Sequence, residues 1–361
     1  MGSATYRVLF QDVLSGYVHG ELPVESFAYT NARNAPGSAS LIVELDPGVS
    51  RVNPQSLIVG AATAVYVERN SRFVWSGLIW DADVDYVNGT IKLECEGWMS
   101  YFRLRGVHTT KQYVQRDQAD IARDLLRHAG TYGTGSRLGM ITYGAELTGV
   151  RRDRTYKEAD RKSIGEAVEQ LAEVREGFDF DFFAAWTGSN EDELTVQFRV
   201  RYPTAGRRRD IVLADGENCD ITAAKLGGKT VRTWALATGA GDGPEQLWAT
   251  SSRPSTVYPR LEAVVSASDV KEYATLKAKA DNVTRIQAAP ILLPTVELYP
   301  DAELGVAELS VGDVVHVSGG YGLVPVNGEW VVTEVAVSVD TAGAETIRAT
   351  VAPLEVLSDD E

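Results

Sequence analysis

Short runs of alternating apolar and polar residues, separated by turn-forming residues, dominate roughly the first 100 positions of the chain. Residues 65–68 and 73–80 have this pattern and flank a polar turn at 69–72. Strict alternation places the apolar side chains on one face of a strand, and short strands separated by turns are typical of β-barrels and β-sandwiches. The pattern therefore predicts a β-barrel or sandwich between about residues 6 and 102.

One hairpin of this region can be registered from the sequence. Asn88-Gly89 predicts a two-residue loop, because both residue types accept the positive φ angles of tight hairpin turns. With that loop, Val84 faces Leu93 and Ala82 faces Cys95, so the apolar pairs lie on one face of the sheet.

The opposite face of the same predicted hairpin is acidic. Its carboxylates are Asp81, Asp83, Asp85, Glu94 and Glu96. The register places Asp83 opposite Glu94 and Asp81 opposite Glu96, whereas Asp85 alone faces a lysine, Lys92. Because like charges directly opposed in a sheet are destabilising, we single out these five carboxylates as the candidate site.

The hydrophobic period then changes to that of an α-helix over residues 117–129 and again over 162–175. Residues 178–182 alternate strictly, which predicts a half-buried strand directly after the second helix. The strand at 195–202 and the apolar run at 211–213 are separated by a basic loop and predict another hairpin.

Glycine and proline at 239–244 and 253–259 predict a domain boundary or long loops rather than regular elements. A further helix is predicted over 269–283, with Ser268 or Asp269 as its cap. No internal repeat of fixed period is visible. The chain then returns to strands at 314–317, 330–339 and 346–351, with a turn at 340–343.

These elements predict an α+β fold dominated by β-structure, with two β-barrel modules flanking a helix-containing middle module. We place an N-terminal barrel at residues 1–105, the middle module at 106–203, and a linker, helix and C-terminal barrel at 204–361. A chain of 361 residues is longer than one hydrophobic core usually organises, which agrees with several modules.

The charge, the cysteines and the absence of long apolar stretches argue against several classes of function. Fifty acidic residues against 35 basic ones give a net charge of −15, which opposes attraction to nucleic acid and to anionic membranes. Cys95 and Cys219 match no metal-binding spacing and predict buried or half-buried free thiols. No stretch is long and apolar enough to span a bilayer, so we expect no membrane insertion.

The sequence lacks the motifs that support enzymatic chemistry. Its four histidines are scattered, and Gly227-Gly228-Lys229-Thr230 lacks the first glycine and the following helix of a phosphate-binding loop. The arginine clusters at 151–154 and 207–209 lack interleaved aromatic residues, so we expect solvated loops or ion pairs between subunits. We therefore expect no catalytic residue, no cofactor, no metal and no enzymatic activity.

Several segments, taken in chain order, resemble a known family. They are Pro36-Gly37-Ser38-Ala39-Ser40, Val65-Tyr66-Val67-Glu68-Arg69, Val74-Trp75-Ser76-Gly77, Glu96-Gly97-Trp98, Asp160-Arg161-Lys162-Ser163-Ile164-Gly165-Glu166-Ala167, Gly177-Phe178-Asp179-Phe180, Leu309-Ser310-Val311-Gly312-Asp313-Val314-Val315 and Gly328-Glu329-Trp330-Val331-Val332-Thr333-Glu334-Val335. This order resembles the first barrel, middle module and closing barrel of minor tail proteins and baseplate hub proteins of long-tailed phages, actinobacterial phages in particular.

The resemblance implies a structural virion protein of the tail tip, assembled in the host bacterial cytoplasm, that continues and closes the tail tube and opens for genome ejection. It also implies a homotrimer with two barrels per subunit around a channel. The expected partners are a distal tail or tube protein above, a fibre or tip protein below, and the tape measure protein. Phage DNA is expected to pass transiently without specific binding.

Alternatives stay open at this point. The acidic face belongs either to the channel wall, to a solvated outer surface screened by salt, or to a divalent-cation site. The chain as a whole is alternatively a host-envelope carbohydrate-binding tail protein, or a cell-wall hydrolase with two carboxylates in a cleft. The candidate sugar platforms are Trp75, Trp80, Trp98, Trp186 and Trp330.

Overall fold

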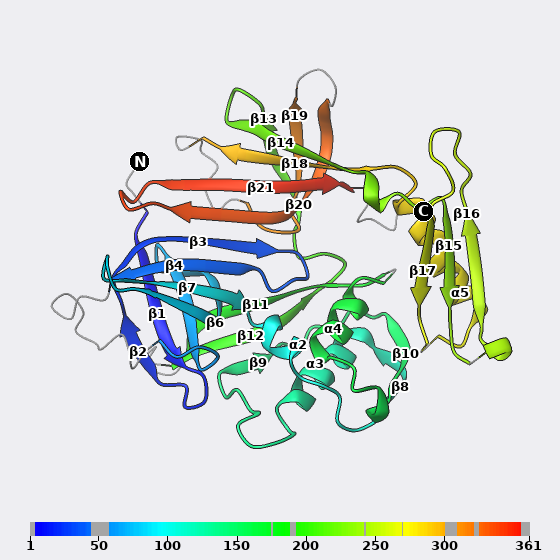
Figure 1. The fold of residues 1–361 in the computed structure, drawn as a ribbon, viewed down its shortest axis with the longest axis horizontal. Coiled ribbons are helices and arrows are strands. Elements are labelled where there is room, and N and C mark those ends of the chain that lie inside the picture. Colours follow the sequence, from blue (N-terminus) through cyan, green and yellow to red (C-terminus); the bar gives the residue numbers. More distant parts are fainter. Residues whose placement is uncertain are drawn as a thin grey trace.

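The computed structural model describes residues 4–44, 58–174, 176–187, 193–241, 243–268, 270–299, 309–320 and 325–354. Strands dominate these residues and helices are few, so the predicted β-dominated α+β class is confirmed. Figure 1 shows strands of both ends of the chain lying together, helices below them and a small separate sheet at the right.

The N-terminal barrel is built around a long bent strand, β6, whose first half pairs with β5 and whose second half pairs with β7. The order of neighbouring strands is β3-β4-β7-β6-β5-β1-β2. The strands are β1 (Tyr6–Asp12), β2 (Val18–Glu21), β3 (Val24–Ala32), β4 (Ser38–Glu44), β5 (Thr63–Arg69), β6 (Arg72–Asp85) and β7 (Thr90–Gly97).

The middle of the chain contains two predicted helices, each capped by the side chain that precedes it. Asp117 accepts a hydrogen bond from the Ala119 amide, and Ser163 accepts one from the Glu166 amide. The elements are α2 (Met99–Arg103), β8 (Lys111–Asp117), α3 (Gln118–Ala129), β9 (Ile141–Tyr143), β10 (Arg151–Tyr156), η1 (Glu158–Asp160), α4 (Ile164–Ala172), β11 (Asp179–Thr187) and β12 (Glu193–Arg201). Their core continues into Leu9, Tyr66 and Leu78, so they pack on the β1–β5 layer of the barrel.

The second barrel has a long bent strand of its own, β20, which pairs with β19 through its first half and β21 through its second. Its strands are β13 (Arg208–Ala214), β14 (Cys219–Gly227), β18 (Ile291–Leu298), β19 (Val314–Gly319), β20 (Val326–Val339) and β21 (Glu345–Pro353). Between β14 and β18 the chain forms the separate small sheet with its helix, from η2 (Gly228–Thr230), β15 (Trp234–Thr238), η3 (Gly243–Glu245), β16 (Trp248–Ser252), β17 (Glu262–Ser266) and α5 (Tyr273–Ile286).

One predicted pairing is wrong, and one predicted helix begins later than expected. The runs at 195–202 and 211–213 form no hairpin, because β12 pairs with β11 and β9 whereas β13 pairs in parallel with β19. Helix α5 begins at Tyr273 rather than at 269, which lies outside the described residues. The carbonyl of Val270 accepts a hydrogen bond from the Ala240 amide, which ties this residue to the small sheet before the helix starts.

The two barrels share a structural repeat that the sequence did not reveal. Strands β5-β6-β7 and β19-β20-β21 have the same pairing, and both long strands have 14 residues. Each long strand has one extra residue in its pairing with the strand that follows it, Trp80 of β6 against β7 and Thr333 of β20 against β21. β6 has a further bulge at Val74, in its pairing with β5. Aligning these two bulges makes Asp81 equivalent to Glu334, Leu93 to Ala349, and each β6–β7 residue pair equivalent to a β20–β21 pair.

The neighbouring strands extend the repeat. Leu41 of β4 faces Leu93, just as Val296 of β18 faces Ala349, so β4 is equivalent to β18. By the same comparison β3 is equivalent to β14. Five residues connect β3 to β4, whereas the whole small sheet is inserted between β14 and β18. This insertion and unequal turns change the spacing between equivalent residues, which explains why no fixed period is visible.

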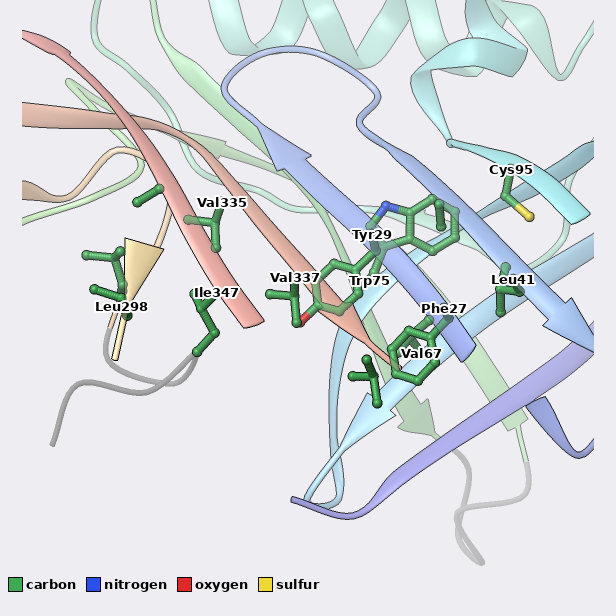
Figure 2. Close-up of a cluster of buried hydrophobic side chains, with 14 of the residues drawn as sticks. Phe27, Tyr29, Leu41, Val67, Trp75, Cys95, Leu298, Val335, Val337 and Ile347 are labelled. Carbon is green, nitrogen blue, oxygen red and sulfur yellow. The ribbon is translucent and has the colours of Figure 1, made fainter. Parts of the chain in front are cut away.

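Backbone pairing joins the barrels within the chain. Strand β3 pairs antiparallel with the second half of β20, from Glu334 opposite Ala32 to Val339 opposite Phe27. One hydrophobic core runs across this joint, and Figure 2 shows Val337 beside Tyr29, between the side chains of the two barrels. The strands β14-β18-β21-β20-β3-β4-β7-β6 therefore form one continuous layer.

A buried carboxylate links the barrels to the middle of the chain. Asp179 is 1% exposed and accepts hydrogen bonds from Arg33 Nε at 2.8 Å, Asn34 Nδ2 at 3.0 Å and the Ala205 amide at 2.7 Å. Three donors from two separate segments converge on this one side chain, and its removal leaves a largely buried arginine without its counter-charge.

We predict that Asp179→Ala lowers the free energy of the first unfolding transition in urea by about 2–4 kcal/mol, because breaking a buried charge pair is costly. The matched control is Asp181→Ala, whose side chain is 37% exposed and pairs with Arg199 and Arg201. The control is expected to lose about 1 kcal/mol or less. Equal losses in the two variants would contradict the assignment of Asp179 as the junction.

Candidate functional site

The β6–β7 hairpin, which contains all five candidate carboxylates, has a different register from the predicted one. Its loop has four residues, 86–89, so Asp85 pairs with Thr90 and Val84 pairs with Ile91. Between Asp81 and Asp85 the shift is two residues, which keeps these side chains on their predicted face but changes their opposite partners. Beyond the bulge at Trp80 the shift is three residues.

The Asp85 side chain explains why the observed register differs from the predicted one. Its Oδ1 accepts hydrogen bonds from the Val87 and Asn88 amides at 2.9 and 3.1 Å, and its Oδ2 accepts one from Asn88 Nδ2 at 2.7 Å. The Asn88 amide in particular holds the pKa of the Asp85 carboxyl below its usual value. A carboxylate that closes the loop in this way fixes a four-residue turn, with only Gly89 in the left-handed region at φ 66°. Asp85 is thus a turn residue.

The corrected register changes the charge pattern of the face. Asp83 lies opposite Lys92 rather than Glu94, and Glu96 lies opposite Leu78 rather than Asp81. One like-charge opposition is present, Asp81 against Glu94. Lys92 Nζ lies 2.5 Å from Glu94 Oε1, and this hydrogen bond raises the pKa of Lys92. The face is therefore acidic but less self-repelling than predicted.

The acidic residues lie at one end of a broader open face. On the continuous eight-strand layer, one set of alternating side chains enters the shared core and the other set remains at least partly exposed. Across the middle of the layer this exposed set consists mainly of small residues, with Ile42, Glu334 and Arg348 among them: Ala28, Thr30, Ser38, Ser40, Ile42, Glu334, Ala336, Ser338, Thr346, Arg348 and Thr350. Such a face offers hydroxyl groups and charged side chains.

The hairpin provides no grouping suited to a metal ion. No set of three histidine, cysteine or acidic side chains in the described ranges could hold one. Both cysteines are buried and free, as predicted. The described part of the chain also contains no helix long and apolar enough to cross a membrane.

Other residues singled out in the sequence have local roles. Trp75, Trp98 and Trp330 are buried, which removes them as sugar platforms. Trp80 donates a hydrogen bond to Ser100, and the Trp186 ring packs on Phe73. Trp248, on the small sheet, is by contrast 60% exposed.

The arginine clusters are not the predicted loops. Residues 151–156 form β10, and Arg208 and Arg209 lie on β13. Arg208 pairs with Glu329 and Arg209 with Asp313, so these ion pairs form within the chain. The reason is that β13 pairs with β19, which brings the cluster close to Asp313, the residue before β19, and to Glu329 of β20, the next strand.

The sequence also concealed two free strand edges. In the part of the chain that the structure describes, the stretch of β14 from Ala223 to Gly227 pairs only with β18, and the stretch of β6 from Asp81 to Asp85 pairs only with β7. The exposed residues of the β14 edge include Lys225 and Leu226. The sequence does contain a short alternating run before Gly227 that indicates a strand. Its pairing partner, β18, is distant in the sequence, so the free edge could not be predicted.

No family model and no curated protein matches the chain in sequence. Solved structures do match over almost its full length. The 43 kDa tail protein of prophage MuSo2 from Shewanella oneidensis has a TM-score of 0.63 and 11% identity, covering 98% of this chain and 100% of its own. A tail protein from Neisseria meningitidis MC58 has a TM-score of 0.62 and 12% identity, covering 98% of both chains.

A third match is prophage tail protein gp18 from Listeria monocytogenes EGD-e, with a TM-score of 0.54 and 10% identity over 97% of this chain and 95% of its own. Three tail proteins from different bacteria thus share the overall fold of this chain, at a sequence identity that shows fold alone. The resemblance expected from the sequence is confirmed at this level: the chain has the fold of bacteriophage tail proteins.

Proposed function

We propose that this protein is a structural subunit of a phage tail tip, the hub that continues and closes the tail tube and opens for genome ejection. The observation that carries this proposal is the eight-strand layer with a shared core behind it and an open, polar face in front. The middle of the chain packs on the opposite, β1–β5 layer, which leaves the polar face free to line a conduit.

The assembly that fits this layer is a homotrimer in a closed ring. A layer that ends in two different free edges joins copies head to tail, and such heterologous contacts form a ring when the rotation closes. The two equivalent barrels of each subunit then alternate around the channel. We divide the chain as expected from the sequence, at residues 105 and 203, with the small sheet as an insertion in the third part.

In this ring Asp81, Asp83, Glu94 and Glu96 belong to the channel wall, and Asp85 closes the hairpin at its rim. DNA carries a phosphate charge about every 1.7 Å, so an acidic wall repels it instead of holding it. Passage then needs no release step, in agreement with transient DNA transit without specific binding.

A non-enzymatic role fits the same structure. The cavity between the first barrel and the middle elements, of about 230 Å³, contains two carboxylates, Asp179 and Asp181. Asp179 is tied to Arg33, and Asp181 to Arg199 and Arg201. Glycoside hydrolysis needs one protonated carboxylic acid and a second carboxylate that acts as base or nucleophile. Pairing with arginine favours the charged form of a carboxylate and disfavours the protonated acid, so the paired carboxylates support the structural role. The proposed partners are a tube or distal tail protein, a fibre or tip protein and the tape measure protein.

We predict three copies of the chain in each purified tail tip, because three two-barrel subunits complete the ring. Quantitative mass spectrometry against a tail protein of known copy number measures this ratio. A count of one or six copies would exclude the proposed ring.

We also predict that Glu94→Lys combined with Glu96→Lys slows genome ejection roughly tenfold at low ionic strength, with a smaller effect at high salt, because a basic wall attracts the phosphates. The rate is measured from DNA release by isolated particles. The control is Glu158→Lys with Asp160→Lys, the same charge change on exposed residues of η1. An equal ejection rate in the two double variants would remove the acidic face from the channel wall.

A further inference from the structure

We propose that neighbouring subunits join by antiparallel pairing of β14 in one copy with the second half of β6 in the next, in a register that places Lys225 opposite Asp83. This inference rests on the proposed ring and specifies the surface by which a second copy of the chain is recognised. The template for it is the β3–β20 joint, which is already formed inside each subunit.

The structural repeat identifies the free edges as counterparts of that joint. Strand β6 is equivalent to β20, and β14 is equivalent to β3. The second half of β20 has β21 on one side and β3 on the other, whereas the second half of β6 has only β7 among the described strands. The missing neighbour of β6 is thus a strand with the position of β3, which is β14 of another copy.

The known joint also fixes the register. Ala336 lies opposite Thr30 in the β20–β3 pairing. The equivalent residues are Asp83 on β6 and Lys225 on β14. The whole transferred register consists of Asp81 opposite Gly227, Ala82 opposite Leu226, Asp83 opposite Lys225, Val84 opposite Ala224 and Asp85 opposite Ala223.

The side chains on the core side of this register are apolar and exposed in the single chain. Leu226 is 56% exposed and Val84 is 41% exposed, and Ala82 and Ala224 are exposed as well. In the equivalent internal joint the same positions include Val337 and Tyr29, which are buried in the shared core. Pairing would therefore bury an apolar strip that the monomer leaves in water.

The side chains on the channel side are complementary in charge. Lys225 is exposed and has no ion-pair partner among the residues that the structure describes. Asp83 is exposed, and its cross-strand neighbour Lys92 bonds instead to Glu94. A one-residue slip would place Lys225 on the opposite face from Asp83, so this pair specifies the register.

The joint is tested by disulfide trapping in the full-length chain carrying Asp83→Cys and Lys225→Cys. Paired strands bring opposite Cα atoms to about 4.5–5.5 Å, which a disulfide spans. Mild oxidation is expected to give covalent dimers and closed trimers and nothing larger on a non-reducing gel. The native Cys95 and Cys219 are buried, and burial raises the pKa of Cys219 to about 11, so they stay unreactive.

The matched control carries Asp83→Cys with Ala224→Cys, which places the two thiols on opposite faces and is expected to give no cross-link. A trimer by native mass in which the Asp83/Lys225 pair fails to cross-link, or cross-links no better than the control, would overturn this register while leaving the hub proposal intact. Cross-linked chains that grow beyond three copies would support the register and overturn the closed ring. A chain that stays monomeric and uncross-linked would contradict both.

Charge reversal gives a second test that needs no covalent bond. Asp83→Lys and Lys225→Asp are each expected to weaken trimer formation roughly tenfold, because each places like charges across the joint. The double reversal Asp83→Lys/Lys225→Asp is expected to restore association to near the original level, as measured by sedimentation. Losses in the double variant that equal the sum of the single losses would show that the two side chains do not meet.

Discussion

The antiparallel pairing of β3 with β20 is the interaction on which the rest of the structure depends. It converts two barrels into one eight-strand layer and lets a single core run from Leu41 to Val351. Tyr6 and Arg69 of the first barrel both donate hydrogen bonds to Glu345 of the second and hold the joint at one side. Because the layer uses its backbone groups internally, its polar face and its two edges are the surfaces left for assembly.

Much of this fold follows from the order of residues. Alternation predicted the strands, the 3.6-residue period predicted α3 and α4, and Asp117 and Ser163 cap them. The hairpin register did not follow, because the Asp85 carboxylate closes a four-residue loop where the Asn88-Gly89 pair is typical of a two-residue one. The repeat was not visible in the sequence because equivalent strands need the same alternation of buried and exposed positions and not the same residues. Leu93 and Ala349, for example, occupy equivalent positions with different side chains.

The acidic face was recognised from sequence, but the energetic reason for its existence changed. Part of the predicted like-charge repulsion is absent, because Lys92 lies opposite Asp83 and forms an ion pair with Glu94. The Asp85 carboxylate accepts hydrogen bonds within the turn. The two free strand edges have no explanation in a single chain. Val84 on the β6 edge and Leu226 on the β14 edge are apolar and exposed, and their contact with water is unfavourable. Unsatisfied edges of this kind favour association, and in a ring the acidic face and the edge have one common explanation.

The central claim is that the polar face of the layer lines a channel. A cryo-EM map of isolated tail tips, at a resolution that separates strands, tests it most directly. The account predicts a continuous wall made of three copies of the β14-β18-β21-β20-β3-β4-β7-β6 layer, with Ser40 and Ala336 facing the axis and the middle helices at the periphery. A map in which this face points outward, or in which the wall is broken between copies, would contradict it.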